Sequence, residues 1–278
     1  MNYLEKKNEY IRIDDLSQFD VNHILDCGQV FRYRNEADCT TVYSKNKICL
    51  LQKRDGYVIM KTEDTDYFAR YFDLSRDYEQ IKRELGAYRG LAEALEFGKG
   101  IRILNQDPLE TIISFIISAN NNIPRIKSII ERICAFLGED MGGYRAFPTV
   151  ERLSQADESF YKSIGAGYRA SYLVKTSRAL LDYDVNRPFG LSTAAARKEL
   201  MSFCGIGGKV ADCILLFAYG KTDLFPMDTW SKKIYKALGF PEEHAPSVMS
   251  ERLVEHFGNL SGYAQQYLYY YFRSNKSE

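Results

Sequence analysis

A lysine beside a glycine-rich turn and an aspartate nineteen residues further on are the side chains of this 278-residue chain whose spacing best suits covalent chemistry. Helical patterns surround the turn, and its glycines permit a positive φ angle and close backbone approach. These features predict a helix-hairpin-helix over about residues 191–219. The second helix would present free N–H groups and the positive end of its dipole at the turn, where they could hold a phosphate. The glycines are Gly205, Gly207 and Gly208, the lysine is Lys209 and the aspartate is Asp228.

Lys209 and Asp228 each allow two interpretations. In the first turn of a helix the dipole disfavours a cation, and partial burial acts in the same direction, so we expect the pKa of Lys209 to lie below its ordinary value. A neutral amine can form a Schiff base, whereas a charged one can contact a phosphate. Asp228 precedes a helix predicted from Thr229, so it can cap that helix, and a cap can also be a catalytic carboxylate.

Composition and cysteine spacing limit the class of protein. The chain is 45% hydrophobic and 27% charged, as in folded globular proteins, and has no apolar run of the roughly 18 residues that span a membrane. None of the six cysteines forms a C-x-x-C pair, so we expect no metal site, no iron–sulfur cluster and no cofactor. Scattered thiols and an N-terminus unlike a signal peptide predict a cytoplasmic protein, acting at the nucleoid if the cell is prokaryotic.

Charge is distributed unevenly, although the net charge is zero. Residues 160–236 hold twelve Lys and Arg against six Asp and Glu, which leaves a local charge of +6 around the hairpin. A basic region of this kind can bind a phosphate backbone, and it can equally be a solvated helical surface. Charge alone leaves both interpretations open.

The first 70 residues carry strand patterns. Apolar and polar residues alternate in four short stretches with close turns, which is typical of an antiparallel sheet. The predicted strands cover residues 29–34, 40–44, 47–52 and 56–61. Because the periodicity becomes helical from about residue 66, the predicted fold class is α+β. We expect an N-terminal antiparallel sheet domain with helices over residues 1–100 and a two-lobed helical domain over residues 101–278.

Residues 107–137 predict two consecutive helices around a break of three asparagines. Asp107-Pro-Leu-Glu starts the first, and its segment 111–119 is apolar nearly all round, so this helix should be central. The second covers residues 123–137. The break suits helix caps, and alternatively its amides could reach a ligand. Further helices are predicted over residues 77–85, 89–95, 150–154, 158–164, 170–181, 229–238 and 245–257, and along the aromatic run from Gly262 to Phe272.

Several of these segments resemble one known family. Gly205-Ile-Gly-Gly-Lys-Val-Ala-Asp followed by Pro226-Met-Asp is similar to the helix-hairpin-helix signature of base-excision DNA glycosylases, and the other segments resemble the 8-oxoguanine DNA glycosylase branch. They occur in the family's order over most of the chain. These segments are Cys27-Gly-Gln-Val-Phe-Arg-Tyr, Gln106-Asp-Pro-Leu-Glu, Ser118-Ala-Asn-Asn-Asn-Ile-Pro-Arg-Ile, Gly167-Tyr-Arg-Ala and Gly262-Tyr-Ala-Gln.

The resemblance implies a bifunctional glycosylase and lyase that removes 8-oxoguanine from duplex DNA. Lys209 would attack C1′ and form a Schiff base, and Asp228 would stabilise the charge that develops on the sugar. The target base must first leave the stack. The Gly28 carbonyl would accept a hydrogen bond from N7–H of the oxidised base, which guanine lacks. The other implied base contacts are Gln265 on the Watson–Crick edge, Tyr269 and Cys213 against the base, and Phe115 and Phe217, for which core packing is an equal alternative.

The resemblance also implies contacts to the opposite strand and two departures from the family pattern. Asn120, Arg125 and Arg169 would hold the orphaned cytosine and Tyr168 would wedge beside it. Trp230 stands where the family commonly has His, and an indole cannot titrate. Tyr269 stands where the stacking residue is commonly Phe. The expected partner is double-stranded DNA containing 8-oxoguanine, and because one subunit suffices per lesion we expect a monomer.

Three other classes of protein remain as comparisons. A relative that removes alkylated bases through Asp-activated water would not need Lys209. The iron–sulfur endonuclease branch requires cysteines, and none follows Cys213. A noncatalytic helix-hairpin-helix DNA-binding protein would need the hairpin and the basic region, but would have no use for Lys209 together with Asp228.

Overall fold

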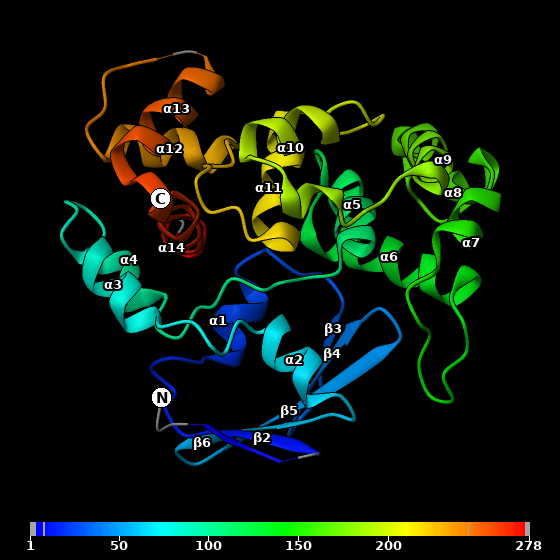
Figure 1. Cartoon of the computed structure of the whole chain (residues 1–278), viewed down its shortest axis with the longest axis horizontal. Coiled ribbons are helices and arrows are strands. Elements are labelled where there is room, and N and C mark those ends of the chain that lie inside the picture. Colours follow the sequence, from blue (N-terminus) through cyan, green and yellow to red (C-terminus); the bar gives the residue numbers. More distant parts are fainter. Residues whose placement is uncertain (1–3, 8, 244, 276–278) are drawn as a thin grey trace.

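The computed structural model describes residues 4–7, 9–243 and 245–275, and the N-terminal part is built on one antiparallel sheet (Figure 1). The strand order is β1-β2-β6-β5-β4-β3, and each neighbouring pair is antiparallel. The strands are β1 (Leu4–Lys6), β2 (Tyr10–Ile13), β3 (Tyr33–Asn35), β4 (Thr40–Ser44), β5 (Lys47–Arg54) and β6 (Tyr57–Lys61). The predicted α+β class and three of the four predicted strands are confirmed.

The prediction of a strand over residues 29–34 is wrong for most of its length, since β3 begins at Tyr33. Gly28 turns the chain with a φ of +85°. The buried Gln29 side chain then donates to the carbonyl of Ile24 and accepts from the N–H of Leu104. These bonds hold residues 29–32 between the sheet and the helices. The alternation of apolar and polar residues there therefore arises from packing against both parts, and not from the two faces of a strand. Strands β1 and β2 are not among the predicted strands, because three or four residues give too little alternation.

Two helices cover one face of the sheet. They are α1 (Val21–Asp26) and α2 (Thr65–Tyr71), which lie above the sheet in Figure 1. Ile24 of α1 and Phe68 of α2 are fully buried in one hydrophobic cluster with the sheet residues. The last residues of α1 lead directly into Gly28, so this layer also places the 26–29 segment against the helical part of the chain.

The helical part is organised around α5 (Pro108–Ser118), which is buried on nearly all sides as predicted. Asp107 caps this helix by accepting the N–H of Glu110. The other helices that follow the sheet are α3 (Tyr78–Gly86), α4 (Ala92–Phe97), α6 (Ile123–Leu137), α7 (Val150–Gln155), α8 (Glu158–Ser163), α9 (Ala170–Ala179), α10 (Thr193–Leu200), α11 (Gly208–Tyr219), α12 (Thr229–Ala237), α13 (Pro246–Phe257) and α14 (Ser261–Ser274). Short 3-10 helices cover Gly167–Arg169, Leu180–Asp182, Arg187–Gly190 and Gly258–Leu260.

Most helix predictions agree with these bounds, and two need correction. The helix expected over residues 89–95 begins only at Ala92, because Gly90 has a positive φ of 86° and interrupts the chain before it. The helix expected over residues 170–181 ends as an α-helix at Ala179 and continues as a 3-10 turn. Both differences lie at helix ends, where sequence patterns fix boundaries least well.

The helical part has its own hydrophobic core, separate from that of the sheet. Buried side chains of α3 and α4, including Ile81, Leu85 and Ala94, belong to this second core together with those of α14. The helices before residue 100 therefore pack with the helical part. A domain division at residue 100 stays a prediction.

Candidate active site

The hairpin between α10 and α11 is held rigidly against the rest of the helical part. Gly205 has a φ of +86°, and a Cβ at this position would lie 2.7 Å from the Cβ of Tyr172, so a larger residue has no room. Thr176 of α9 donates to the carbonyl of Cys204 at 2.7 Å. Arg197 of α10 pairs with the buried Asp212 of α11 at 2.6 Å and ties the two helices together.

The end of the hairpin presents backbone rather than side chains. Gly207 is exposed and is the N-cap of α11, and among the described residues no side chain accepts from the first turn of this helix. A Cβ on Gly207 would meet nothing within 4 Å, whereas one on Gly208 would lie 2.4 Å from the guanidinium of Arg197. Free N–H groups and the positive end of the helix dipole are the features from which phosphate binding is expected, and that role stays a prediction.

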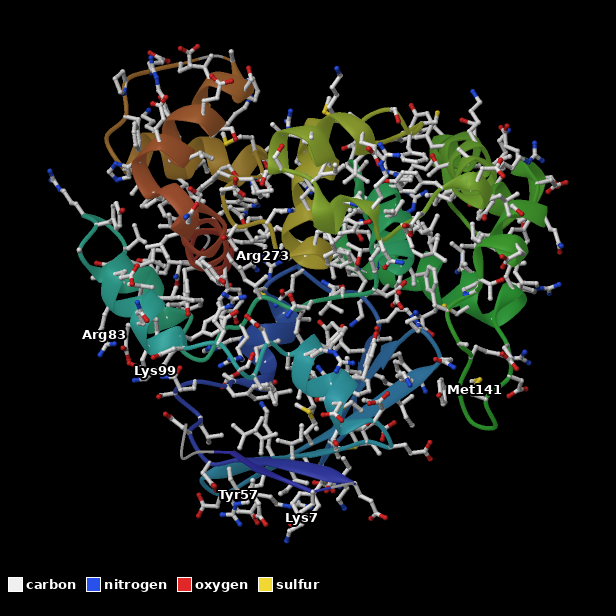
Figure 2. All side chains as sticks on the ribbon, viewed as in Figure 1. Lys7, Tyr57, Arg83, Lys99, Met141 and Arg273 are labelled. Atoms are coloured by element: carbon white, nitrogen blue, oxygen red, sulfur yellow. The ribbon has the colours of Figure 1, made fainter. Side chains whose placement is uncertain are left out.

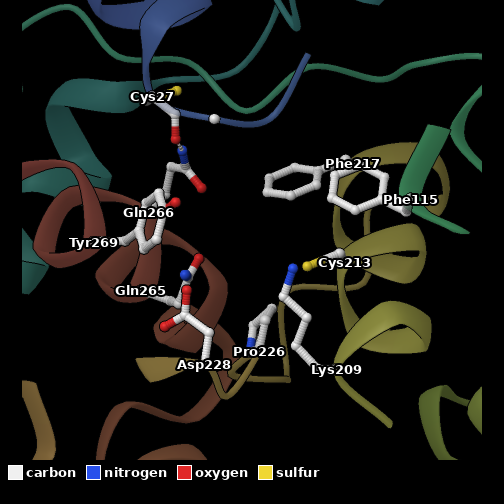
Figure 3. Close-up of a pocket in the computed structure, with 11 residues that line it drawn as sticks. Cys27, Phe115, Lys209, Cys213, Phe217, Pro226, Asp228, Gln265, Gln266 and Tyr269 are labelled. Carbon is white, nitrogen blue, oxygen red and sulfur yellow. Dashed lines mark hydrogen bonds between the residues drawn. The ribbon is translucent and has the colours of Figure 1, made fainter. Parts of the chain in front are cut away.

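Lys209 lies in the first turn of α11 and its amine reaches a pocket, where it lies beside the sulfur of Cys213 one turn further on (Figure 3). The expected direction of its pKa shift is wrong. Attraction to Cys213 is the largest cause that raises the pKa of Lys209, and Asp228 also raises it, so that together they outweigh burial. Burial raises the pKa of Cys213 to about 11, so its thiolate attracts the Lys209 ammonium only at high pH, and Asp228 supplies the negative charge at neutral pH. The amine must therefore lose a proton before it can attack.

Asp228 both caps α12 and lines the pocket, so the two interpretations of this residue are compatible. Its Oδ1 accepts from the N–H of Trp230 at 2.9 Å and from the N–H and hydroxyl of Ser231 at 2.8 and 3.0 Å. These three bonds all go to one oxygen and fix the plane of the carboxylate, and no described residue donates to Oδ2. Lys233 lies 4.5 Å over the Trp230 ring, which puts a cation beside the indole that replaces the family's histidine.

The pocket brings together every residue predicted for catalysis and for base binding. Its lining contains Lys209, Asp228, Gly28, Gln265, Tyr269, Cys213, Phe115 and Phe217, and also the unpredicted Cys27, Pro226 and Gln266. Sequence reasoning missed these three because Cys27 and Gln266 sit next to predicted residues without a chemical signature of their own. Pro226 stood in the signature, but only as a family match.

The two walls of the pocket are aromatic on opposite sides. Figure 3 shows the Tyr269 ring on one side, and Phe217 with Cys213 on the other. Phe115 and Phe217 are buried and stack on each other with ring centroids 5.5 Å apart, so they serve the core and the pocket together. The Oε1 atom of the buried Gln265 has no hydrogen-bond partner among the described residues. A flat polar ring between these walls could satisfy it.

The residues predicted to meet the opposite strand form a second group, outside this pocket. Tyr168 is 54% exposed, and its hydroxyl donates to the carbonyl of Ala119. Arg169 is buried and donates to the carbonyls of Ala119 and Asn120. Arg125 is exposed and donates to the Gly165 carbonyl at 3.0 Å.

The three asparagines of the break differ in role. Asn122 caps α6 by accepting the N–H of Arg125, and Asn121 donates to the carbonyl of Ile117. Asn120 is exposed and has a positive φ of 49°. The cap interpretation therefore holds for Asn122, and Asn120 is the asparagine free to face a ligand.

The described ranges contain neither a metal-binding cluster nor a membrane-spanning helix. No three or more His, Cys, Asp and Glu side chains there are grouped to hold a metal ion, and the six cysteines are free thiols. None of the described helices is both long enough and apolar enough to pass through a bilayer.

Comparisons with known proteins give the same assignment as the geometry. The family model for the 8-oxoguanine DNA glycosylase N-terminal domain matches residues 12–112, and that for HhH-GPD superfamily base excision DNA repair proteins matches residues 113–258. The second match alone covers more than half of the chain. The chain belongs to the 8-oxoguanine DNA glycosylase family of the HhH-GPD superfamily. The predicted family and the enzyme class, N-glycosylase with DNA lyase activity, are confirmed.

Individual relatives extend over most of the chain. A Clostridium acetobutylicum 8-oxoguanine glycosylase/lyase, solved in complex with dsDNA containing cytosine opposite to 8-oxoG, superposes with a TM-score of 0.92 at 37% identity and covers 99% of this chain and 98% of its own. A probable N-glycosylase/DNA lyase of Methanothermobacter thermautotrophicus is 32% identical over 71% of each chain. The N-glycosylase/DNA lyase of Saccharomyces cerevisiae is 28% identical over 79% of this chain and 68% of its own.

Proposed function

We propose that this enzyme binds double-stranded DNA containing 8-oxoguanine, excises the base through Lys209 and then nicks the strand in base-excision repair. One observation carries the proposal: Lys209, Asp228, Gly28 and Gln265 converge from four separate segments on a single pocket. A noncatalytic DNA-binding protein would have no use for an amine and a carboxylate beside such a pocket.

The chemistry proceeds through a covalent adduct. After the amine of Lys209 loses a proton, its nitrogen forms a bond to C1′ of the extruded nucleotide, and the bond from C1′ to the base breaks so that the base leaves with the electron pair. The negative charge of Asp228 stabilises the positive charge that develops on the sugar. The sugar ring then opens to a Schiff base. Loss of a proton from C2′ expels the 3′ phosphate, and water finally releases Lys209.

Recognition is supplied by the other wall of the pocket. The base stacks between Tyr269 and the Cys213 side, the Gly28 carbonyl accepts N7–H, and the unsatisfied oxygen of Gln265 accepts from the Watson–Crick edge. Guanine has an acceptor at N7. Its partial negative charge would repel the Gly28 carbonyl oxygen, which is also an acceptor. One contact can therefore separate the lesion from the normal base.

The second group of residues is proposed to act where the damaged base has left the helix. Asn120, Arg125 and Arg169 would bind the orphaned cytosine, and Tyr168 would wedge beside it. Arg125 is the most accessible of the charged pair, because Arg169 is buried and engages backbone carbonyls. Arg125→Ala should reduce the preference for cytosine over adenine opposite the lesion, measured as the ratio of single-turnover excision rates. An unchanged ratio would contradict this assignment. We further propose that the enzyme acts as a monomer in the cytoplasm, since one chain supplies the complete pocket.

Borohydride trapping tests the covalent step. The enzyme is mixed with an 8-oxoguanine:C duplex and reduced, and we expect a stable protein–DNA adduct that is absent with Lys209→Gln. Lys198→Gln, which changes an exposed lysine of α10, is the matched control and should still form the adduct. The absence of an adduct with the native enzyme would refute the lyase mechanism.

A further inference from the structure

The segment that carries Gly28 has an unusual pattern of backbone hydrogen bonds. The carbonyl of Cys27 accepts from Nε2 of Gln266 at 2.9 Å, and the carbonyl of Gln29 accepts from Nε2 of Gln106 at 2.7 Å. The carbonyl of Asp26 accepts from Nη2 of Arg273. Three of four successive carbonyls are thus held by side chains that come from far along the chain.

Gly28 is the exception in this run of four carbonyls. No described residue donates a hydrogen bond to its carbonyl, although Gly28 lines the pocket. Its φ of +85° places it in a conformation that favours glycine. A Cβ on Gly28 would lie 2.9 Å from Nη1 of Arg273 and 3.2 Å from the Tyr269 ring, so the peptide is packed tightly against α14.

Gln266, Arg273 and Gln106 can restrict the motion of the 26–29 segment because they belong to other, well-packed parts of the chain. Gln266 is 1% exposed and follows Gln265 on α14, so one helix supplies both a predicted base contact and a support for the Gly28 peptide (Figure 3). Arg273 lies two turns further along α14, where that helix faces the end of α1 (Figure 2). Gln106 approaches from the segment that precedes α5. The supports therefore come from two separate elements, α14 and the segment before α5.

We propose that Gln266, Gln106 and Arg273 are positioning residues that fix the Gly28 carbonyl and thereby set the discrimination between 8-oxoguanine and guanine. The proposal rests on the role proposed above for Gly28. A single carbonyl can distinguish N7–H from an unprotonated N7 only if its oxygen is held in line with that N–H, because hydrogen bonds weaken steeply when misaligned. By satisfying the neighbouring carbonyls, the three side chains leave that of Gly28 as the acceptor open to the pocket.

The test compares two lesions that differ at position 7, where the N–H of one is replaced by carbon in the other. In a Lys209→Gln background, which prevents turnover, dissociation constants are measured for duplexes with 8-oxoguanine or 7-deaza-8-oxoguanine opposite cytosine. The deaza base carries C–H instead of N7–H. We expect the native contacts to favour 8-oxoguanine about tenfold, and Gln266→Leu to bring this ratio close to one, since it removes the donor to Cys27 at similar volume. Gln106→Leu should act in the same direction.

Controls separate this inference from general damage to the fold. Tyr271→Phe removes another α14 hydrogen bond, to Glu93 of α4, leaves the three bonds to the 26–29 segment in place, and should leave the ratio unchanged. Arg273→Lys keeps a donor and should retain more of the ratio than Arg273→Met. If the unsubstituted background shows no preference between the two lesions, the role of Gly28 fails. If it shows the preference and both Gln266→Leu and Gln106→Leu keep it, the positioning role is refuted.

Discussion

On the hairpin side of the pocket, Lys209 and Asp228 are nineteen residues apart in the chain, whereas on the α14 side Gly28 and Gln265 are separated by most of its length. The reacting pair is held by helix termini, with Lys209 in the first turn of α11 and Asp228 capping α12. The recognition pair depends on long-range hydrogen bonds between the 26–29 segment and α14. In the proposed mechanism the chemistry is local to one signature, whereas lesion recognition depends on contacts between segments far apart in the chain. Changes to the two sides should therefore have separable effects.

The largest loss is expected from Asp228→Asn. Asparagine keeps an oxygen that can cap α12, but it removes the negative charge, so single-turnover excision of 8-oxoguanine should fall by about 100- to 1,000-fold. Affinity for a duplex with a stable abasic analogue should stay close to native. If affinity and excision fall in parallel, Asp228 is a structural cap and not a catalytic carboxylate.

Gly28→Ala should cause the next largest loss, and on the recognition side. The added Cβ would press on Arg273 and Tyr269, and the positive φ disfavours alanine, so excision should drop by about ten- to 100-fold. Gly56→Ala is the matched control, because Gly56 has a similar φ of 82° but nothing within 4 Å of the added carbon. Equal losses in both variants would indicate backbone strain rather than a role in the pocket.

A smaller effect, on pH dependence, is expected from Cys213→Ala. Attraction to Cys213 is the largest cause of the raised pKa of Lys209, so the variant should have a lower pKa at that amine. Because the neutral amine is the nucleophile, the rate of nicking at a preformed abasic site should rise with pH and reach its plateau at a lower pH in the variant. A pH–rate profile measures this shift, and a shift toward higher pH would contradict the cause assigned here.

The smallest effect on either activity is expected at the buried pair of Arg32 and Glu110, which joins the 29–34 segment to α5 at 3.5 Å. Glu110→Gln removes the charge of a buried carboxylate that desolvation disfavours more than Arg32 favours it, so the variant should be at least as stable as the native protein at pH 7, measured in urea. Burial raises the pKa of Glu110 from 4.5 to about 6. The native protein binds a proton there that the unfolded chain has released, so its stability should decline as pH rises through that window.

Glu110→Gln has no titrating group at this position and should lack that decline. Its ratio of excision to abasic-site nicking should equal that of the native enzyme, because neither side of the pocket is altered. A changed ratio would mean that the pair also positions the recognition segment.

The sequence predicted the hairpin, the helix termini that hold Lys209 and Asp228, and most helices, because these depend on local patterns: glycines at a turn, caps, and apolar periodicity. Gly28 and Gln265 could be proposed only through the family resemblance, since no local pattern relates residues so far apart. The positioning role of Gln266 had no sequence signal at all. The pKa shift of Lys209 was mispredicted because the dipole and burial are visible in sequence, whereas the contact of its amine with Cys213 and the approach of Asp228 are products of the fold.

The separation of recognition from chemistry is tested most directly by Gln265→Ala. Excision of 8-oxoguanine and nicking at a preformed abasic site are measured under single-turnover conditions in parallel, since the second reaction needs Lys209 and no base. The excision rate should fall by about tenfold or more, because a buried contact to the base is lost, while nicking stays near the native rate. Equal losses in the two reactions would show that the α14 side takes part in the chemistry itself, and would contradict the division of labour inferred from this pocket.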